Sequence, residues 1–112
     1  MKKIEAIIRR SRFEYVRLAL EEAGCHGISV IEIQGYGQQQ VITKELRGED
    51  YKITLLPKMK LEIIVKDKDA DKIIKTIIEN AKSGEIGDGK IFVSDINEAI
   101  KIRTGEKGVD VV

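Results

Sequence analysis

The chain has 112 residues and a mass of 12.6 kDa, which suits one compact domain and leaves no room for a second. Its 20 Lys and Arg residues balance 19 Asp and Glu residues, so the net charge of +1 gives no general attraction to nucleic acid or to an acidic membrane. Cys25 is the only cysteine, which excludes an intramolecular disulfide, and charged residues interrupt every early apolar run. We therefore expect a cytoplasmic domain over residues 1–112 without a signal peptide, a membrane span or a nucleic-acid partner.

The first predicted elements are a strand and a helix. Lys2–Arg9 alternates apolar and polar residues, which is typical of a half-buried strand. A helix is predicted over Arg12–Ala23, where apolar residues recur at spacings of three and four. Ser11 and Glu14 form the pattern of a capping box at its start, and Gly24 supplies a C-terminal stop.

The same kinds of pattern continue through the rest of the chain. Further strands are predicted over Ile28–Ile33, Lys58–Lys66 and Ile91–Val93, and a second helix over Ala70–Lys82 with Asp67 or Asp69 as its cap. Two strand–helix–strand units in so short a chain predict an α+β fold, the ferredoxin-like βαββαβ sandwich.

Two segments fall outside this repeat. A long polar loop, about Tyr36–Lys52, separates the second and third strands; we expect a β-ribbon at its base and an exposed tip. After the fourth strand, Ile96–Ile100 predicts a short helical turn and Ile100–Arg103 a short C-terminal strand. The polar tail Glu106–Val112 is expected to be mobile.

A glycine-bracketed turn before the fourth strand is the main candidate site. Gly87 and Gly89 can adopt positive φ angles, so the backbone N–H groups around Asp88 can converge on an anion, and Lys90 adds a positive charge. Lys101 and Arg103 would share one face of the C-terminal strand and could supply further cations for a polyphosphate. The alternative is an ordinary turn with a solvated lysine.

Two motifs carry a resemblance to a known family. One is the loop segment Arg47-Gly48-Glu49-Asp50-Tyr51, and the other is the turn Gly87-Asp88-Gly89-Lys90-Ile91-Phe92-Val93. Together they resemble the PII nitrogen-regulatory signal-transduction family, and the likeness runs without gaps from Met1 to Glu106. It implies a homotrimer that is not an enzyme, binds ATP and ADP in clefts between subunits, and signals nitrogen or energy status to partner proteins.

The resemblance also implies site residues. Those matching the nucleotide site are Ile7, Ser29, Gly35, Tyr36, Gly37, Gln38, Glu62, Ile64, Gly87, Asp88, Gly89, Lys90, Lys101 and Arg103. Those matching the 2-oxoglutarate site are Gly37, Gln39, Gln40, Val41 and Lys58, with Gln39 also helping a Mg²⁺ ion bound to the nucleotide. The loop residues Arg47, Gly48 and Tyr51 match the surface that engages an ammonium transporter or a nitrogen-metabolism enzyme, and Tyr51 matches a modification site.

Several positions depart from the family pattern. Gln38 and Lys101 stand where arginine is usual, which reduces bidentate phosphate contact and is expected to alter nucleotide affinity or the preference between ATP and ADP. Val41 stands where glycine is common, and a β-branched residue restricts the backbone of a ligand cradle. Leu46 replaces an aromatic residue of the loop.

Two alternative functions remain. The first is a sensor that responds to ATP and ADP only, without 2-oxoglutarate. The second is a small phosphate-handling enzyme similar to acylphosphatases, in which the basic segment Arg9–Arg12 would hold the phosphate at the start of a helix.

Overall fold

The computed structural model describes residues 1–36, 42–46, 49–53 and 55–112, with backbone only for 42–46 and 49–53. The strands are β1 Lys2–Arg9, β2 Ser29–Tyr36, β3 Ile42–Leu46, β4 Glu49–Ile53, β5 Leu55–Val65 and β6 Lys90–Asp95. The helices are α1 Phe13–Glu22 and α2 Asp67–Ala81, with short 3-10 helices η1 at Arg10–Arg12 and η2 at Val109–Val111.

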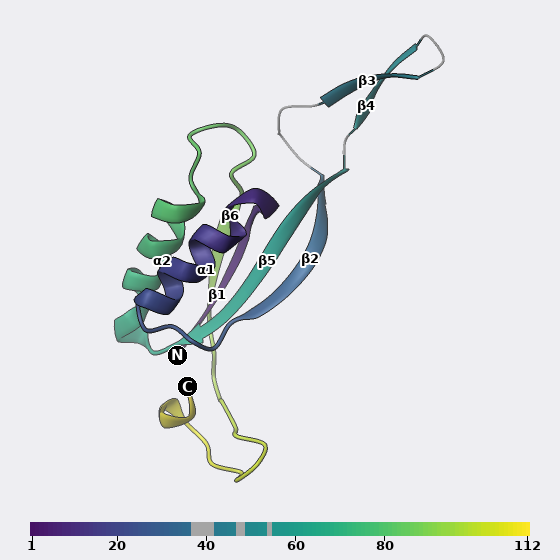
Figure 1. The fold of residues 1–112 in the computed structure, drawn as a ribbon. Coiled ribbons are helices and arrows are strands. Elements are labelled where there is room, and N and C mark those ends of the chain that lie inside the picture. The colour runs from purple at the N-terminus through teal and green to yellow at the C-terminus, as the bar shows by residue number, and fades with distance from the viewer. Residues whose placement is uncertain (37–41, 47–48, 54) are drawn as a thin grey trace.

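Four strands form one antiparallel sheet in the order β2-β5-β1-β6. Both helices pack on the same face of this sheet, as Figure 1 shows. The element order β1-α1-β2-β5-α2-β6 and this strand order are those of the ferredoxin-like sandwich, so the predicted α+β fold is confirmed.

The core lies between the helices and the sheet. Alternate residues of the two central strands are buried there: Ile4, Ala6 and Ile8 of β1, and Met59, Leu61, Ile63 and Val65 of β5. The helices contribute buried residues at helical spacing: Val16 and Leu20 of α1, and Ala70, Ile73, Ile77 and Ala81 of α2. The other residues of the strands therefore point to the opposite face of the sheet, which we call the open face. Among the described residues no helix or strand covers it.

The long connection between β2 and β5 contains a separate two-stranded ribbon. β3 pairs with β4 in antiparallel register, from Ile42 opposite Ile53 to Leu46 opposite Glu49. Figure 1 shows this ribbon projecting beyond the ends of β2 and β5. A β-ribbon is therefore present in the long loop, but it is a separate pair of strands and not the predicted ribbon at the base of the loop.

The predicted helix caps are wrong in detail. Helix α1 begins at Phe13, and no side chain caps its start, because Ser11 lies within η1 and the Glu14 carboxylate accepts a 2.8 Å bond from Arg17 Nη2. Helix α2 begins at Asp67 without a side-chain cap. The Asp67 carboxylate instead lies 2.8 Å from the amino terminus of Met1. In both helices a carboxylate that the sequence pattern predicts to cap the helix start instead pairs with a positive charge: Glu14 with Arg17, and Asp67 with the amino terminus.

The predicted C-terminal elements also need correction. Ile96–Ile100 is not helical, and Ile100–Arg103 forms a turn rather than a strand. The physical reason is that this segment folds back on itself: Lys101 N–H donates to Glu106 O at 2.8 Å, and Gly105 N–H donates to Lys101 O at 2.7 Å. These bonds use the backbone groups that a sheet neighbour would need. The mobility expected of Glu106–Val112 stays a prediction.

Candidate functional site

The segment of residues 83–89, which we call the glycine turn, joins α2 to β6 and is organised around Asp88. One carboxylate oxygen of Asp88 accepts bonds from the backbone N–H groups of Ser83 and Gly84, each at 2.9 Å. The other oxygen accepts from the Ser83 hydroxyl and, at 3.1 Å, from Arg9 Nε. Asp88 therefore shapes the turn from within, and its side chain is already engaged by the protein.

Hydrogen bonding decides the charge of Asp88. Burial raises the pKa of its carboxyl, but the bonds from Ser83, Arg9 and Gly84 outweigh that effect and hold the pKa well below its usual range. The carboxylate is thus ionised at neutral pH, and protonating it would weaken the bonds that organise the turn.

This pKa shift predicts a pH dependence of stability. A carboxyl with a lowered pKa in the folded state stabilises the fold fully above its unfolded pKa of about 4, and that contribution falls as the pH falls below it. We expect Asp88→Asn to lower the free energy of unfolding at neutral pH, and the gap from the unmodified protein to shrink in acid. Urea unfolding at about pH 7 and about pH 3 measures it. An equal gap at both pH values would contradict this account.

Two cations from neighbouring strands hold the glycine turn against the sheet. Arg9 at the end of β1 also donates from Nη2 to the carbonyl of Ile86 at 2.8 Å. Lys58 of β5 stands directly opposite Arg9 and donates from Nζ to the carbonyl of Gly87 at 2.6 Å. Lys58 is only 7% exposed. Burial lowers the pKa of Lys58, the charge of Arg9 lowers it further, and Asp88 acts in the opposite direction.

Gly87 and Gly89 meet the backbone requirement that their sequence pattern predicts. Their φ angles are +102° and +99°, in the region that favours glycine. A Cβ atom on Gly89 would overlap the carbonyl oxygen of Ile7, so the end of the turn lies tightly against β1. Gly89 is therefore required both for its φ angle and for this close approach.

The turn leaves backbone donors available. The N–H groups of Gly87, Asp88 and Gly89 make no hydrogen bond to any acceptor among the described residues. Lys90 follows directly as the first residue of β6, opposite Ile7, and its side chain is exposed. Successive backbone donors next to a lysine suit a phosphate group.

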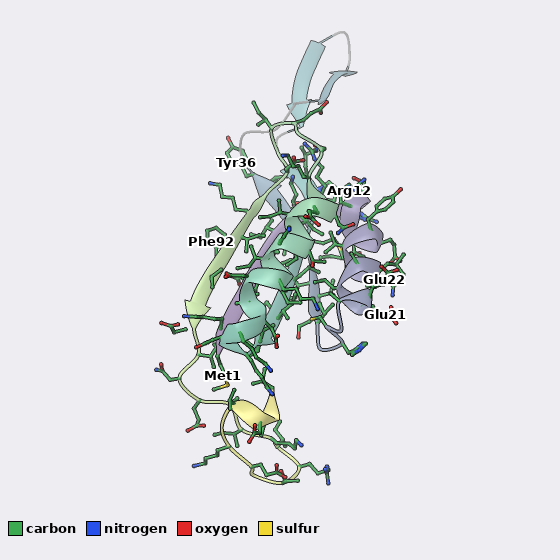
Figure 2. The ribbon with its side chains drawn as sticks, turned by 90° about the vertical axis from the view of Figure 1, so that its left-hand side faces the viewer. Met1, Arg12, Glu21, Glu22, Tyr36 and Phe92 are labelled. Atoms are coloured by element: carbon green, nitrogen blue, oxygen red, sulfur yellow. The ribbon has the colours of Figure 1, made fainter. Side chains whose placement is uncertain are left out.

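The open face carries six of the other residues predicted to bind the nucleotide. Ladder positions place Ile7 of β1, Gly35 of β2 and Lys90 of β6 at the end of the sheet near the turn. Ser29 of β2 and Glu62 and Ile64 of β5 lie farther along this face, away from the turn. Tyr36, the last residue of β2, is 78% exposed (Figure 2). Glycine at position 35 leaves room for the side chain of Lys58, because a Cβ on residue 35 would lie 2.8 Å from Lys58 Cγ.

Charged side chains on the open face pair with one another. Lys60 Nζ lies 2.7 Å from Glu5 and 3.4 Å from Glu62, and Lys3 Nζ lies 3.7 Å from Glu62. The carboxylate of Glu62 thus pairs with two lysines, Lys3 and Lys60. A nucleotide bound beside Glu62 would therefore also lie near these lysines.

Lys101 and Arg103 do not join the glycine turn within this chain. The turn precedes Lys90 at the start of β6, whereas Lys101 and Arg103 follow its last residue, Asp95. Figure 1 shows the C-terminal segment beyond the end of the sheet opposite to the turn. The predicted sharing of one strand face by Lys101 and Arg103 is wrong, because the segment is a turn.

The loop residues are only partly described. Gly37, Gln38, Gln39, Gln40 and Val41, and also Arg47 and Gly48, lie outside the described residues. Tyr51 belongs to β4, where its backbone pairs with that of Lys44. The ligand and partner roles implied for these residues stay predictions.

The basic segment Arg9–Arg12 does not form the phosphate loop of the enzyme alternative. Arg9 is engaged by Asp88 and Ile86. Arg12 Nε donates to the carbonyl of Asn80 at 2.9 Å, and its guanidinium lies 4.2 Å from the centre of the Tyr15 ring. Two of the three arginines thus serve intramolecular contacts.

Sequence reasoning missed the role of Arg9 in the glycine turn. Arg9 and Asp88 lie 79 positions apart, and in the sequence Arg9 stands beside two other basic residues, Arg10 and Arg12. It also missed a cavity of about 240 Å³ beside the turn, between the end of α2 and β6, lined by apolar residues that include Ile77, Ile78 and Ile91.

Neither helix in the described ranges combines the length and the apolar character needed to cross a membrane.

Comparison with known proteins identifies the family. A family model described as Nitrogen regulatory protein P-II matches residues 1–106. A relative from Methanothermobacter thermautotrophicus, named Nitrogen regulatory protein P-II 2, is 55% identical over 108 residues, which are 96% of this chain and 94% of the relative. Relatives named Nitrogen regulatory protein P-II from Rhodobacter capsulatus and Rhizobium meliloti are 49% and 47% identical over 112 residues, the full length of all three chains.

These names describe proteins that regulate nitrogen use. They support a role in nitrogen signalling and exclude the acylphosphatase-like alternative, so the chain is not an enzyme. On the match over residues 1–106 and the full-length likeness to these relatives, the chain belongs to the nitrogen regulatory protein P-II family.

Proposed function

We propose that the chain binds ATP and ADP through the glycine turn and passes nitrogen or energy status to partner proteins through its long loop. The observation that carries the proposal is the set of backbone N–H groups at Gly87, Asp88 and Gly89, which have no acceptor among the described residues and stand next to Lys90. A polyphosphate would supply the missing acceptors and meet the charge of Lys90.

The nucleotide site would lie between subunits of a homotrimer. Three large apolar side chains on the open face support this arrangement: Ile31 is 47% exposed, Ile64 37% and Phe92 51%. Figure 2 shows Phe92 on the side of β6 away from the helices. Apolar groups gathered on one uncovered face favour contact with another protein surface. A second copy of the chain could also bring Lys101 and Arg103 to a turn that they do not reach within one chain.

The proposed effector is 2-oxoglutarate, bound only with Mg-ATP. Lys58 would hold one carboxylate of the effector, and the placement of Lys58 beside Gly87 supports a site adjoining the nucleotide. Gln39 and the backbone of Gly37, Gln40 and Val41 would complete the site, with Gln39 also helping the Mg²⁺ ion. A Mg²⁺ ion shared by nucleotide and effector explains why one would depend on the other, because this ion prefers hard oxygen ligands from substrates.

The proposed partner is an ammonium transporter or an enzyme of nitrogen metabolism in the cytoplasm. Arg47, Gly48 and Tyr51 of the long loop would make the contact, and Tyr51 would be the modified residue where modification occurs. Ligand binding can move the loop only by favouring one of its states over another. Gln39, which lies near the start of the long loop in the sequence, would couple the ligand to the loop.

Calorimetry with ATP and with ADP tests the nucleotide proposal. We expect binding by the unmodified protein, and a dissociation constant roughly ten- to a hundred-fold larger for Lys90→Ala, because a charge-assisted phosphate contact is lost. Lys75→Ala on the exposed side of α2 removes the same charge at a distance and serves as the control. No heat of nucleotide binding, or equal losses in both variants, would contradict the site.

A further inference from the structure

Arg9 is the residue of the sheet that contacts the glycine turn at two points. Its Nε donates to Asp88 at 3.1 Å and its Nη2 donates to the carbonyl of Ile86 at 2.8 Å. The side chains of Arg9 and Asp88 are only 20% and 24% exposed. A planar guanidinium that uses two of its donors in this way sets orientation as well as distance.

Asp88 connects these contacts to the rest of the turn. The same carboxylate accepts the N–H groups of Ser83 and Gly84, which lie at the other end of the turn. Arg9 therefore contacts the middle of the turn directly, at Ile86, and acts on its first residues, 83 and 84, through Asp88. The N–H groups of Gly87, Asp88 and Gly89 follow Ile86 directly in the chain, and Asp88, whose side chain Arg9 contacts, is the middle residue of these three.

The guanidinium is engaged rather than free. Both of its described bonds go to the protein, and Lys58, which carries a like charge, stands directly opposite on β5. Besides burial, the charge of Arg9 lowers the pKa of Lys58 and the charge of Asp88 raises it, so Asp88 offsets the repulsion between the two cations. An arginine held in this way is suited to shape a site rather than to contact the ligand.

We propose that Arg9 is a positioning residue of the nucleotide site: through Asp88 and the carbonyl of Ile86 it holds the backbone donors of the glycine turn in the arrangement that a polyphosphate needs. The inference rests on the proposed nucleotide binding. Arg9 and Asp88 then act as one unit. Although Asp88 is negatively charged, it favours the binding of a negative ligand because its carboxylate holds the glycine turn in shape.

Opposite charge changes distinguish positioning from direct attraction. Arg9→Gln removes a positive charge near the phosphates, and Asp88→Asn removes a negative one. If the two residues acted by their charge on the ligand, Arg9→Gln would weaken binding and Asp88→Asn would strengthen it. If they position the turn, both variants weaken binding by roughly tenfold, and the double variant is no weaker than the worse single variant because the two act as a unit.

The experiment is calorimetric titration of Mg-ADP into the unmodified protein, Arg9→Gln, Asp88→Asn and the double variant. Arg10→Gln, an exposed neighbour in η1, is the control for charge and is expected to bind like the unmodified protein. Thermal unfolding shows whether each variant is folded at the titration temperature. If Arg9→Gln is not folded there, Asp88→Asn alone decides between the two mechanisms.

Four results would overturn the inference. Tighter binding by Asp88→Asn, or unchanged binding by a folded Arg9→Gln, leaves the proposed nucleotide site standing and removes only the positioning role. Losses that add in the double variant show that Arg9 and Asp88 act separately. Absence of Mg-ADP binding by the unmodified protein overturns the proposed function and this inference with it.

Discussion

Replacing Gly89 by alanine is expected to abolish nucleotide binding and to lower the free energy of unfolding by more than about 2 kcal/mol. The φ angle of +99° alone costs an L-residue about 1–2 kcal/mol. The added Cβ would also overlap the carbonyl oxygen of Ile7, and that atom belongs to the backbone of a central strand and cannot move cheaply. Urea unfolding and calorimetry with ATP measure the two effects.

Gly84→Ala is the matched control for this prediction. Gly84 has a similar φ of +89° in the same turn, but a Cβ there would meet no atom within 4 Å. Gly84→Ala should lower the free energy of unfolding by about 1–2 kcal/mol, the cost of the positive φ angle alone, and should retain nucleotide binding. Equal losses in both variants would mean that the close approach of Gly89 to β1 is unimportant.

Lys58→Ala is expected to abolish 2-oxoglutarate binding in the presence of Mg-ATP. The lysine is the proposed partner of an effector carboxylate, and removing one member of a buried charge-assisted pair is among the most costly changes in a binding site. A smaller loss of ADP affinity should accompany it, because Lys58 also donates to the carbonyl of Gly87. Titration of 2-oxoglutarate with Mg-ATP, with Mg-ADP and without nucleotide measures the effect.

Lys68→Ala, an exposed position in α2, is the charge-matched control and should respond like the unmodified protein. Binding of 2-oxoglutarate by the unmodified protein only with Mg-ATP would support the proposed effector. No binding under any of the three conditions would leave a sensor of ATP and ADP alone, and equal binding under all three would remove the proposed role of Mg²⁺.

Local patterns predicted the sandwich because the burial of each element follows its period. Ile4, Ala6 and Ile8 alternate in β1, and Ile73 and Ile77 recur in α2, and all five are buried where those periods place them. The turn was also visible, since glycine at positions 87 and 89 is the residue that its φ angles favour.

What the sequence did not predict depends on partners distant in the chain. Asp67 bonds the amino terminus instead of capping α2. Arg9 meets Asp88 only after the strands have assembled, so the arginine looked like part of a basic run. Alternation of apolar and basic residues over Ile100–Arg103 predicted a strand. A strand needs a neighbouring strand for its backbone hydrogen bonds, but here Lys101 N–H donates to the carbonyl of Glu106 in the same turn.

The central claim is that backbone donors of the glycine turn hold the phosphates, and a nitrogen–proton correlation spectrum recorded during titration with Mg-ADP tests it most directly. The account predicts that the largest shifts fall on the amides of Gly87, Asp88, Gly89 and Lys90, and that the amides of Arg10–Arg12 in η1 change little. Largest shifts at Arg10–Arg12, with the glycine turn unmoved, would contradict it.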